Sequence, residues 1–204
     1  NARMNTHSTP EQAARPRIKD KRQAILDAAL KVFAKGGVNG VPMPALAEQA
    51  QVGTGTIYRY FSSKEALVNE LFREQKRTTS TRLYRELDLS LPAKSLFAIV
   101  WQRMADFSRS DPDAYMFMEL QDHRPYLDDE SKALEKKILK PIVERYRQLQ
   151  QEGLFRSDVR PEVLMSMVWG AFVNLIRAER DGHLTLQQSD IDAAFKACWS
   201  MCTG

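Results

Sequence analysis

The stretch TGTIYRYFSSKEAL, residues 54–67, decides the fold. It crowds small residues, two tyrosines, an arginine and a lysine between two segments that have helical periodicity. Such a surface suits contact with a phosphate backbone. The alternative is that a short helix ends in aromatic side chains that pack against the next helix. The surrounding sequence has to decide between these two interpretations.

The segments before and within this stretch have the outline of a helix-turn-helix. Apolar residues recur at helical spacing over 17–35, and Gly36 and Gly37 follow where a left-handed cap is expected. A short second helix is predicted over 44–51. After a tight turn, a third helix runs through Phe61. This order of short helices predicts a small DNA-binding unit.

The outer face of the predicted third helix carries groups that suit a DNA groove. Glycine lets the backbone approach a base edge, threonine offers a hydroxyl and a methyl group, arginine pairs with guanine or phosphate, and tyrosine hydroxyls donate to phosphate. Lys64 would add charge at the free N–H groups of the next helix. The predicted DNA-binding residues are Thr54, Gly55, Thr56, Tyr58, Arg59, Tyr60, Lys64 and Arg17.

The segment IYRYFSSKEAL, following ALAEQAQVGTG, closely resembles the recognition segment of the TetR family of transcriptional regulators. The matching positions are Leu46, Ala47, Ala50, Val52, Gly55, Thr56, Ile57, Tyr58, Tyr60, Phe61, Ser63, Lys64, Glu65 and Leu67. The preceding RQAILDAALKVFAKGGVNGV is similar to the family's first helix and glycine turn. The resemblance covers roughly residues 17–72. It implies a DNA-binding homodimer with a small-molecule pocket among the middle helices.

Three features of this segment depart from the family pattern. Gln51 replaces the turn glycine, so a residue with a side chain must take a conformation that glycine adopts more easily. Gly53 replaces the usual serine N-cap and is a weaker cap. Val41 and Pro42 stand where the family usually has threonine or serine, so a phosphate contact common in the family is expected to be missing.

The remainder of the chain predicts longer helices. SSKEALVNELF contains a capping box, with Ser62 as N-cap and Glu65 at N3, and opens a helix that reaches about Leu87. Pro141 should kink or split one of the later helices, and Gly153 and Gly182 mark helix ends. The later helices are expected near 93–109, 112–121, 128–152, 161–181 and 187–202.

The predicted fold is therefore all-α with about nine helices, because no segment shows the alternation of a strand. Residues 1–16 are expected to form a flexible basic arm. Residues 17–62 would form the helix-turn-helix DNA-binding domain, and residues 63–204 a larger helical regulatory and dimerisation domain.

Charge is distributed unevenly along the chain. Residues 1–87 hold 15 Lys and Arg against 8 Asp and Glu, whereas residues 88–204 hold 15 against 18. A basic first part and a mildly acidic remainder favour a polyanionic partner for the N-terminal unit only. The two cysteines, Cys198 and Cys202, are too few for a disulfide scaffold, and no apolar run is long enough to span a bilayer, so we expect a cytoplasmic protein without a membrane partner.

A helix-turn-helix monomer contacts few base pairs, so we expect a homodimer. The segment PEVLMSMVWGAFVNLIRAER is apolar around nearly its whole circumference, as for a helix that faces a core on one side and a partner on the other. One stripe holds Val163, Met167, Ala171 and Leu175, and another holds Met165, Trp169, Val173 and Ile176; the sequence does not decide which of them faces the partner. The candidate dimerisation residues are Val173, Ile176, Phe195 and Trp199.

Aromatic and thioether side chains are dense over residues 97–118 and can line an adaptable apolar cavity, although any protein core uses the same residues. His123 is a candidate polar contact, with an ordinary loop histidine or an i,i+4 metal pair with Glu119 as alternatives. An apolar or aromatic effector is predicted. The candidate ligand-binding residues are Trp101, Met104, Phe107, Tyr115, Phe117, His123, Met165 and Trp169.

An enzyme is not expected, because the sequence contains no phosphate loop, no GxSxG and no CxxC, and only three histidines. No cofactor or metal is predicted. The predicted function is a ligand-responsive repressor that binds a palindromic double-stranded DNA operator as a homodimer. The alternative is a DNA-binding dimer without a small-molecule effector, regulated by protein partners or purely architectural.

Overall fold

The computed structural model describes residues 18–204, with side chains from Lys21 onward. Within this part the chain forms nine α-helices and no strand, which confirms the all-α prediction. In chain order they are α1 (Ile18–Gly40), α2 (Met43–Gln49), α3 (Thr54–Tyr60), α4 (Lys64–Tyr84), α5 (Ala93–Ser110), α6 (Pro112–Tyr115), α7 (Asp129–Gln151), α8 (Pro161–Arg180) and α9 (Gln188–Thr203). A π-helix (Met116–Leu120) and a 3-10 turn (Arg124–Tyr126) lie between α6 and α7.

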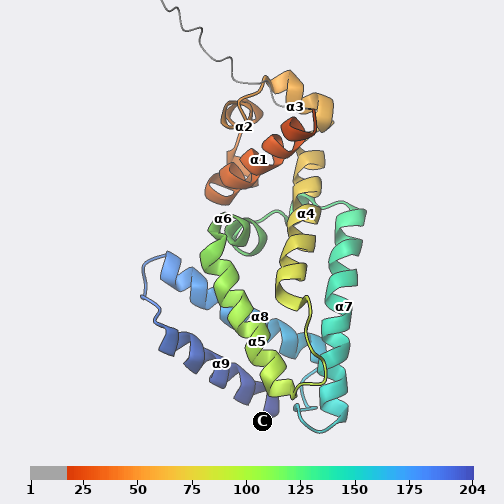
Figure 1. Cartoon of the computed structure of the whole chain (residues 1–204), viewed down its shortest axis with the longest axis vertical. Coiled ribbons are helices and arrows are strands. Elements are labelled where there is room, and N and C mark those ends of the chain that lie inside the picture. The colour runs from red at the N-terminus through yellow and green to blue at the C-terminus, as the bar shows by residue number, and fades with distance from the viewer. Residues whose placement is uncertain (1–17) are drawn as a thin grey trace, which may run out of the picture.

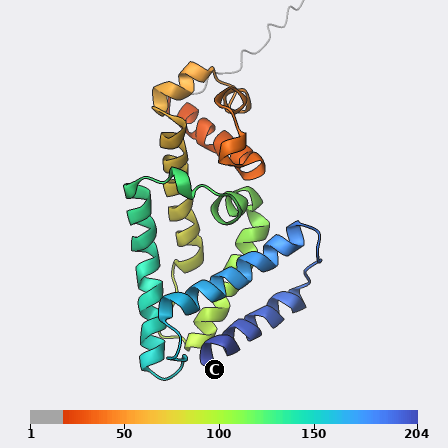
Figure 2. The ribbon, with the colours of Figure 1, turned by 180° about the vertical axis from the view of Figure 1, so that it is seen from behind.

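The helices form a small head and a larger body (Figure 1). Helices α1, α2 and α3 make the head at one end of the molecule, and α4 runs from the head into the body, where α7 lies beside it. At the opposite end, α8 and α9 run next to each other (Figure 2). The predicted arm over residues 1–16 and Arg17 lie outside the described residues.

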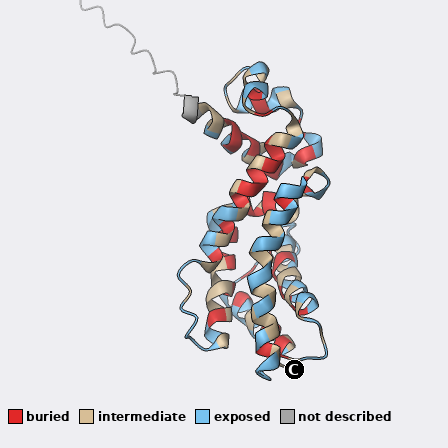
Figure 3. Ribbon diagram, turned by 90° about the vertical axis from the view of Figure 1, so that its right-hand side faces the viewer, coloured by how far each residue is buried: buried red, intermediate tan, exposed pale blue. Residues whose placement is uncertain are grey.

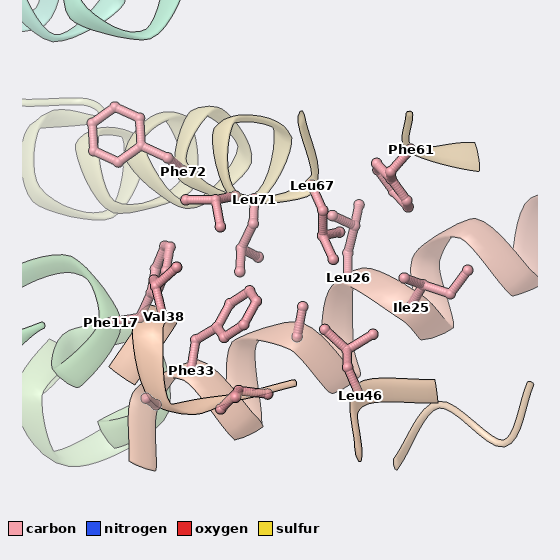
Figure 4. Packing of buried hydrophobic residues seen from close by; sticks show 14 of the residues in the cluster. Ile25, Leu26, Phe33, Val38, Leu46, Phe61, Leu67, Leu71, Phe72 and Phe117 are labelled. Atoms are coloured by element: carbon pink, nitrogen blue, oxygen red, sulfur yellow. The ribbon is translucent and has the colours of Figure 1, made fainter. Parts of the chain in front are cut away.

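The core of the head joins side chains of α1, α2 and α4 (Figure 4). Leu26 and Phe33 of α1 pack with Leu46 of α2 and with Leu67 and Leu71 of α4. The same cluster also takes side chains from the segment that follows α6, namely Phe117, Met118 and Leu127. The head therefore rests directly on residues 116–127 of the body, and a movement of that segment would act on α1.

A second apolar cluster fills the body. It combines side chains of α5, α8 and α9, with Trp101, Phe172 and Ile191 among its buried members. Helix α7 covers one side of the body with only Ser131 and Leu149 buried, so most of its surface faces solvent (Figure 3). Leu83 of α4 belongs to this second cluster, so α4 contributes to both cores.

The predicted glycine positions are confirmed. Gly37 interrupts α1 with a φ of 67°. Gly153 and Gly182 have φ values of 74° and 76° directly after α7 and α8. At each of these two ends, the backbone N–H of the residue after the glycine donates to a carbonyl in the last helical turn. Leu154 N–H donates to the Leu149 carbonyl, and His183 N–H donates to the Ala178 carbonyl. These bonds satisfy carbonyl groups that a helix end leaves without partners.

The start and end of α4 differ from the prediction. Ser63, not Ser62, is the N-cap, and its hydroxyl accepts from Ala66 N–H at 3.1 Å. The reason is that Phe61 is buried in an extended conformation, which delays the helix by one residue. The helix ends at Tyr84 rather than near Leu87, because the chain turns through Arg85 in an extended conformation and a positive φ at Glu86.

Two other helices also differ from the prediction. Helix α7 runs unbroken through Pro141, so the predicted split is wrong. Pro141 and Lys137, whose carbonyl loses its helical donor, both face solvent, where water replaces the missing bond. The helix expected over 112–121 changes at Met116 into a π-helix, a wider turn that is often found at functional sites.

Candidate functional site

The turn between α2 and α3 aims the third helix outward. Gln51 has a φ of 54°, which confirms that a residue with a side chain holds the conformation glycine would take. Val52 N–H donates to the Ala47 carbonyl at 3.0 Å and closes the turn. Gly53 is the N-cap of α3 and makes no side-chain cap bond, as its sequence position predicted.

One face of α3 is buried and the other is open. Ile57 is fully buried in the core of the head, whereas Gly55, Tyr58 and Arg59 are exposed, Tyr58 by 49%. Thr54, Thr56 and Tyr60 lie at intermediate depth. A groove of about 360 Å³ is lined by Lys21, Thr56, Arg59 and Tyr60. Three of the predicted DNA-binding residues of α3, Thr56, Arg59 and Tyr60, thus line one groove, and α1 adds Lys21, a cation that the sequence analysis had not singled out.

Lys64, the first residue of α4, is already engaged in contacts within the head. Its ammonium donates to the Val41 carbonyl at 2.6 Å and stands 5.9 Å from the centre of the Phe33 ring. It therefore ties the start of α4 to the residue before α2. Pro42, the N-cap of α2, makes no side-chain cap bond.

Comparison with known proteins places this geometry in a family. The model of bacterial regulatory proteins of the tetR family matches residues 25–71, and a tetracyclin repressor-like C-terminal domain model matches residues 72–203. The chain belongs to the TetR family. It is therefore a DNA-binding transcription regulator with an N-terminal helix-turn-helix and a C-terminal helical domain.

Individual TetR-family proteins resemble the chain over different lengths. The HTH-type transcriptional repressor KstR of Rhodococcus jostii is 51% identical over 63 residues, which span 30% of this chain and 30% of that relative. A putative TetR-family regulator from Vibrio parahaemolyticus has a TM-score of 0.73 and 28% identity over 91% of this chain and 100% of its own. FadR from Bacillus subtilis, solved in complex with stearoyl-CoA, has a TM-score of 0.68 at 21% identity over 89% of this chain and 97% of its own, which shows a shared fold.

The candidate ligand residues of this TetR-family regulator divide between the two cores. Trp101, Met104, Phe107 and Tyr115 are buried in the second cluster, whereas Phe117 is buried in the head cluster. The indole N–H of Trp101 donates to the Ile191 carbonyl at 3.0 Å and fixes α5 to α9. Met165 and Trp169 lie at intermediate depth on α8. The predicted set is therefore not one surface.

Glu119 connects the π-helix to α8. Its carboxylate accepts a hydrogen bond of 2.9 Å from the Trp169 indole N–H. Burial raises its pKa above the ordinary value of 4.5, and the charge of Glu135 adds to this, whereas the Trp169 bond and Lys76 act in the opposite direction. Sequence reasoning did not place Glu119 among the ligand residues. The sequence feature that could have indicated Glu119 is that it is the single acidic residue inside the apolar run YMFMEL.

Three buried polar atoms have no hydrogen-bond partner among the described residues. They are the Thr79 hydroxyl, the Tyr115 hydroxyl and Nδ1 of His123. His123 lies between the rings of Phe72 and Phe117, with centroid distances of 5.0 and 5.2 Å, and burial lowers its pKa below 6.5. The helix ends at Leu120, so Glu119 and His123 do not share a helical face, and the alternative of an i,i+4 metal pair is not supported.

The candidate dimerisation residues are placed mostly inward. Val173 and Ile176 are buried, with 9% and 8% exposure, so these two side chains have little surface left for a partner. Phe195 and Trp199 pack partly against the second cluster and contact the Phe97 ring. The apolar residues of α8 that face outward are Val163 and Met167, with 37% and 46% exposure. Over residues 18–204, no helix is long and apolar enough to cross a bilayer.

Proposed function

We propose that this TetR-family regulator binds a palindromic operator as a homodimer, represses transcription, and is released by a small molecule held in its C-terminal domain. The observation that carries the proposal is the open face of α3, where Gly55, Tyr58 and Arg59 project from a helix whose opposite side is locked into the head core. A recognition helix enters the major groove in this way, with its N-terminal residues against base edges.

The groups on this face have complementary tasks. Gly55 brings the backbone close to the DNA, because a Cβ there would meet no protein atom within 4 Å and so would point at the partner. Arg59 and Lys21 line one groove and would meet phosphate or a guanine edge. Tyr58 would donate its hydroxyl to a phosphate.

The proposed homodimer uses the outward face of α8. Val163 and Met167 are one helical turn apart, and the exposed Ala171 continues their row. Large apolar side chains that stay half exposed in a row are typical of surfaces that another protein covers. Two copies joined here would carry two heads and match the two-fold symmetry of a palindromic operator.

The proposed effector lies between α4, α8 and the segment 116–127. That segment contacts both the interior, through Glu119 and Trp169, and the head, through Phe117 and Met118. A molecule bound beside Glu119 would therefore move residues on which α1 rests. Release from DNA requires that the molecule bind the two conformations with different affinity.

The test is a fluorescence anisotropy titration with labelled DNA from upstream of the protein's own gene, at several salt concentrations. Arg59→Ala and Tyr58→Phe should weaken binding, and Arg59→Ala should reduce the salt slope by about 1 if the guanidinium contacts phosphate. Lys136→Ala, which removes an exposed charge on α7, is the matched control and should change little. Weak, unselective binding that is unchanged by both α3 substitutions would refute the proposal that the open face of α3 contacts the DNA.

The homodimer is tested separately by analytical ultracentrifugation. Met167→Glu should shift the protein to monomer and weaken operator binding with it. Leu89→Glu is the control, because Leu89 is 74% exposed in the loop after α4 and does not belong to α8. A Met167→Glu protein that remains a dimer would place the interface elsewhere. A regulator whose DNA affinity responds to no small molecule would instead support the alternative of a DNA-binding dimer without an effector.

A further inference from the structure

The interior of the body holds a polar group of residues inside an apolar frame. Its members come from α4, α6, α7, the π-helix and the segment just after it, and three of them carry the buried atoms without a partner. They are Lys76, Thr79, Tyr115, Glu119, His123 and Glu135. We call these six residues the polar cluster.

One ion pair and several electrostatic effects link the members of the polar cluster. Lys76 of α4 bonds Glu135 of α7 at 3.0 Å. Both of these charges act on the pKa of Glu119 and on the pKa of His123. The charge of Glu119 in turn raises the pKa of the Tyr115 hydroxyl. Thr79 lies one turn beyond Lys76 on the same helix, so its hydroxyl belongs to the same side of α4.

Leaving these atoms unpaired is costly for a protein core. A buried donor or acceptor without a partner destabilises the folded state, and the great majority of buried polar atoms have partners. Thr79, Tyr115 and His123 are each less than 10% exposed, at 6%, 3% and 6%. Three such atoms among the described residues favour an interior that receives hydrogen bonds from a bound molecule.

The charges of the polar cluster favour a cation over an anion. Glu119 and Glu135 are two carboxylates, and Lys76 is the one ammonium among the six residues and is already bonded to Glu135. Arg124 also reaches Glu135 at 3.4 Å, and the charge of Arg177 acts on the Tyr115 hydroxyl, but both arginines are exposed, so water screens their charges. Among the described residues, the neutral Trp169 N–H is the bonded partner of Glu119, and a positive charge added beside this buried carboxylate would be stabilised.

Aromatic rings surround the same place. Tyr115 contacts Phe107 and Phe172 at centroid distances of 5.7 and 6.5 Å, and Trp169 approaches from α8. Aromatic faces attract cations as well as apolar groups. Resting on the effector function proposed above, we propose that the effector is an amine: an apolar or aromatic body whose basic nitrogen pairs with Glu119 and whose other polar groups reach Tyr115, Thr79 or His123.

The experiment compares three head groups carried by the same aromatic chain. Phenethyl, phenylbutyl and phenylhexyl chains, each as amine, alcohol and carboxylic acid, are titrated into the full-length protein at neutral pH by isothermal calorimetry. At least one amine should bind at least ten times more tightly than the acid that carries the same aromatic chain. Glu119→Gln keeps an acceptor for Trp169 and should abolish this preference. Glu86→Gln removes an exposed carboxylate after α4 and should keep it.

A second variant separates the loss of a ligand contact from misfolding of the protein. Tyr115→Phe deletes a hydroxyl that has no partner, so the free protein should unfold at the same or a higher temperature while its amine affinity falls severalfold. Each of four outcomes would overturn the inference. They are equal affinity for all three head groups, tighter binding of the acids, no binding of any of the compounds, and ordered water alone beside Glu119 in a crystal soaked with the amine. Operator binding is measured on the same samples without amine. If it is lost, the proposed function fails, whereas intact operator binding with no amine preference refutes only the effector class.

Discussion

The side-chain amide of Gln121 donates a hydrogen bond of 2.7 Å to the backbone carbonyl of Ala34 and joins the end of the π-helix to α1. The same side chain lies against Gly37, where an added Cβ would come within 3.2 Å of the Gln121 oxygen. The left-handed break in α1 therefore also makes room for a contact from the body.

Gln121→Ala should lower the free energy of unfolding by about 1 kcal/mol, because the partly buried Ala34 bond is lost without replacement. Amide hydrogen exchange over residues 34–41 should become faster, since this end of α1 loses its tie to the body. Gln188→Ala is the control, because its bonds are made to exposed side chains. Unchanged stability and exchange would show that this bond does not hold the head.

Gln51→Gly should raise the free energy of unfolding by up to about 1 kcal/mol, because a left-handed φ costs a residue with a Cβ about that much. The matched control is Gln49→Gly in α2, an exposed helical position where glycine should destabilise by about the same amount. Urea denaturation measures both. Loss of stability in the two variants alike would mean that the Gln51 side chain makes a contribution larger than its backbone strain.

Local rules predicted much of this architecture. A glycine that ends a helix and a glutamine forced into a glycine conformation both depend on a few neighbouring residues, and both were found where the sequence places them. The choice between Ser62 and Ser63 as N-cap was missed because it depends on how deeply Phe61 packs into the head, which is a tertiary effect.

The interior could not be predicted in the same way. Glu119 and Trp169 are 50 positions apart, and nothing in either local pattern shows that they meet. Helix α8 is apolar around most of its circumference, so periodicity could not show that Val173 faces inward and Met167 outward. Side-chain partners that are distant in sequence need the packed fold.

Gly55→Ala should separate folding from DNA binding. A Cβ at this position meets nothing within 4 Å, and alanine favours a helix by up to about 1 kcal/mol over glycine, so the free protein should be at least as stable. Operator affinity should nevertheless fall about tenfold, which corresponds to about 1.4 kcal/mol, if the backbone approaches the DNA here. Full affinity together with raised stability would place the closest DNA approach elsewhere on α3.

Lys64→Met tests whether the ammonium serves the fold or the DNA. The Val41 carbonyl would lose its 2.6 Å donor and the Phe33 ring would lose the ammonium that lies 5.9 Å from its centre, so stability should fall by about 1 kcal/mol. The salt slope of operator binding should stay that of the unmodified protein. A slope reduced by about 1 would show instead that Lys64 leaves Val41 to contact a phosphate.

Glu119→Gln should change how stability depends on pH. The pKa of Glu119 is raised in the folded state by burial, so ionisation costs more in the folded protein than in the unfolded chain. Below the ordinary value of 4.5 both states are protonated, and as pH rises from there through the folded pKa the stability contribution of Glu119 is lost. The groups that act on its charge are Trp169, Lys76 and Glu135.

Because glutamine never ionises, the stability of Glu119→Gln relative to the unmodified protein should increase as pH rises from 4.5 through the folded-state pKa of Glu119 and then level off. Thermal unfolding at matched pH values measures this difference in stability. The pKa of His123 is lowered in the folded protein, so its contribution to stability is lost as pH falls below 6.5. Both proteins contain His123, so this contribution cancels in the difference between them. Glu86→Gln, an exposed carboxylate, should give a curve parallel to the unmodified protein. A Glu119→Gln curve that is also parallel would mean that the carboxylate is well solvated, and it would weaken the case for a buried partner of an amine.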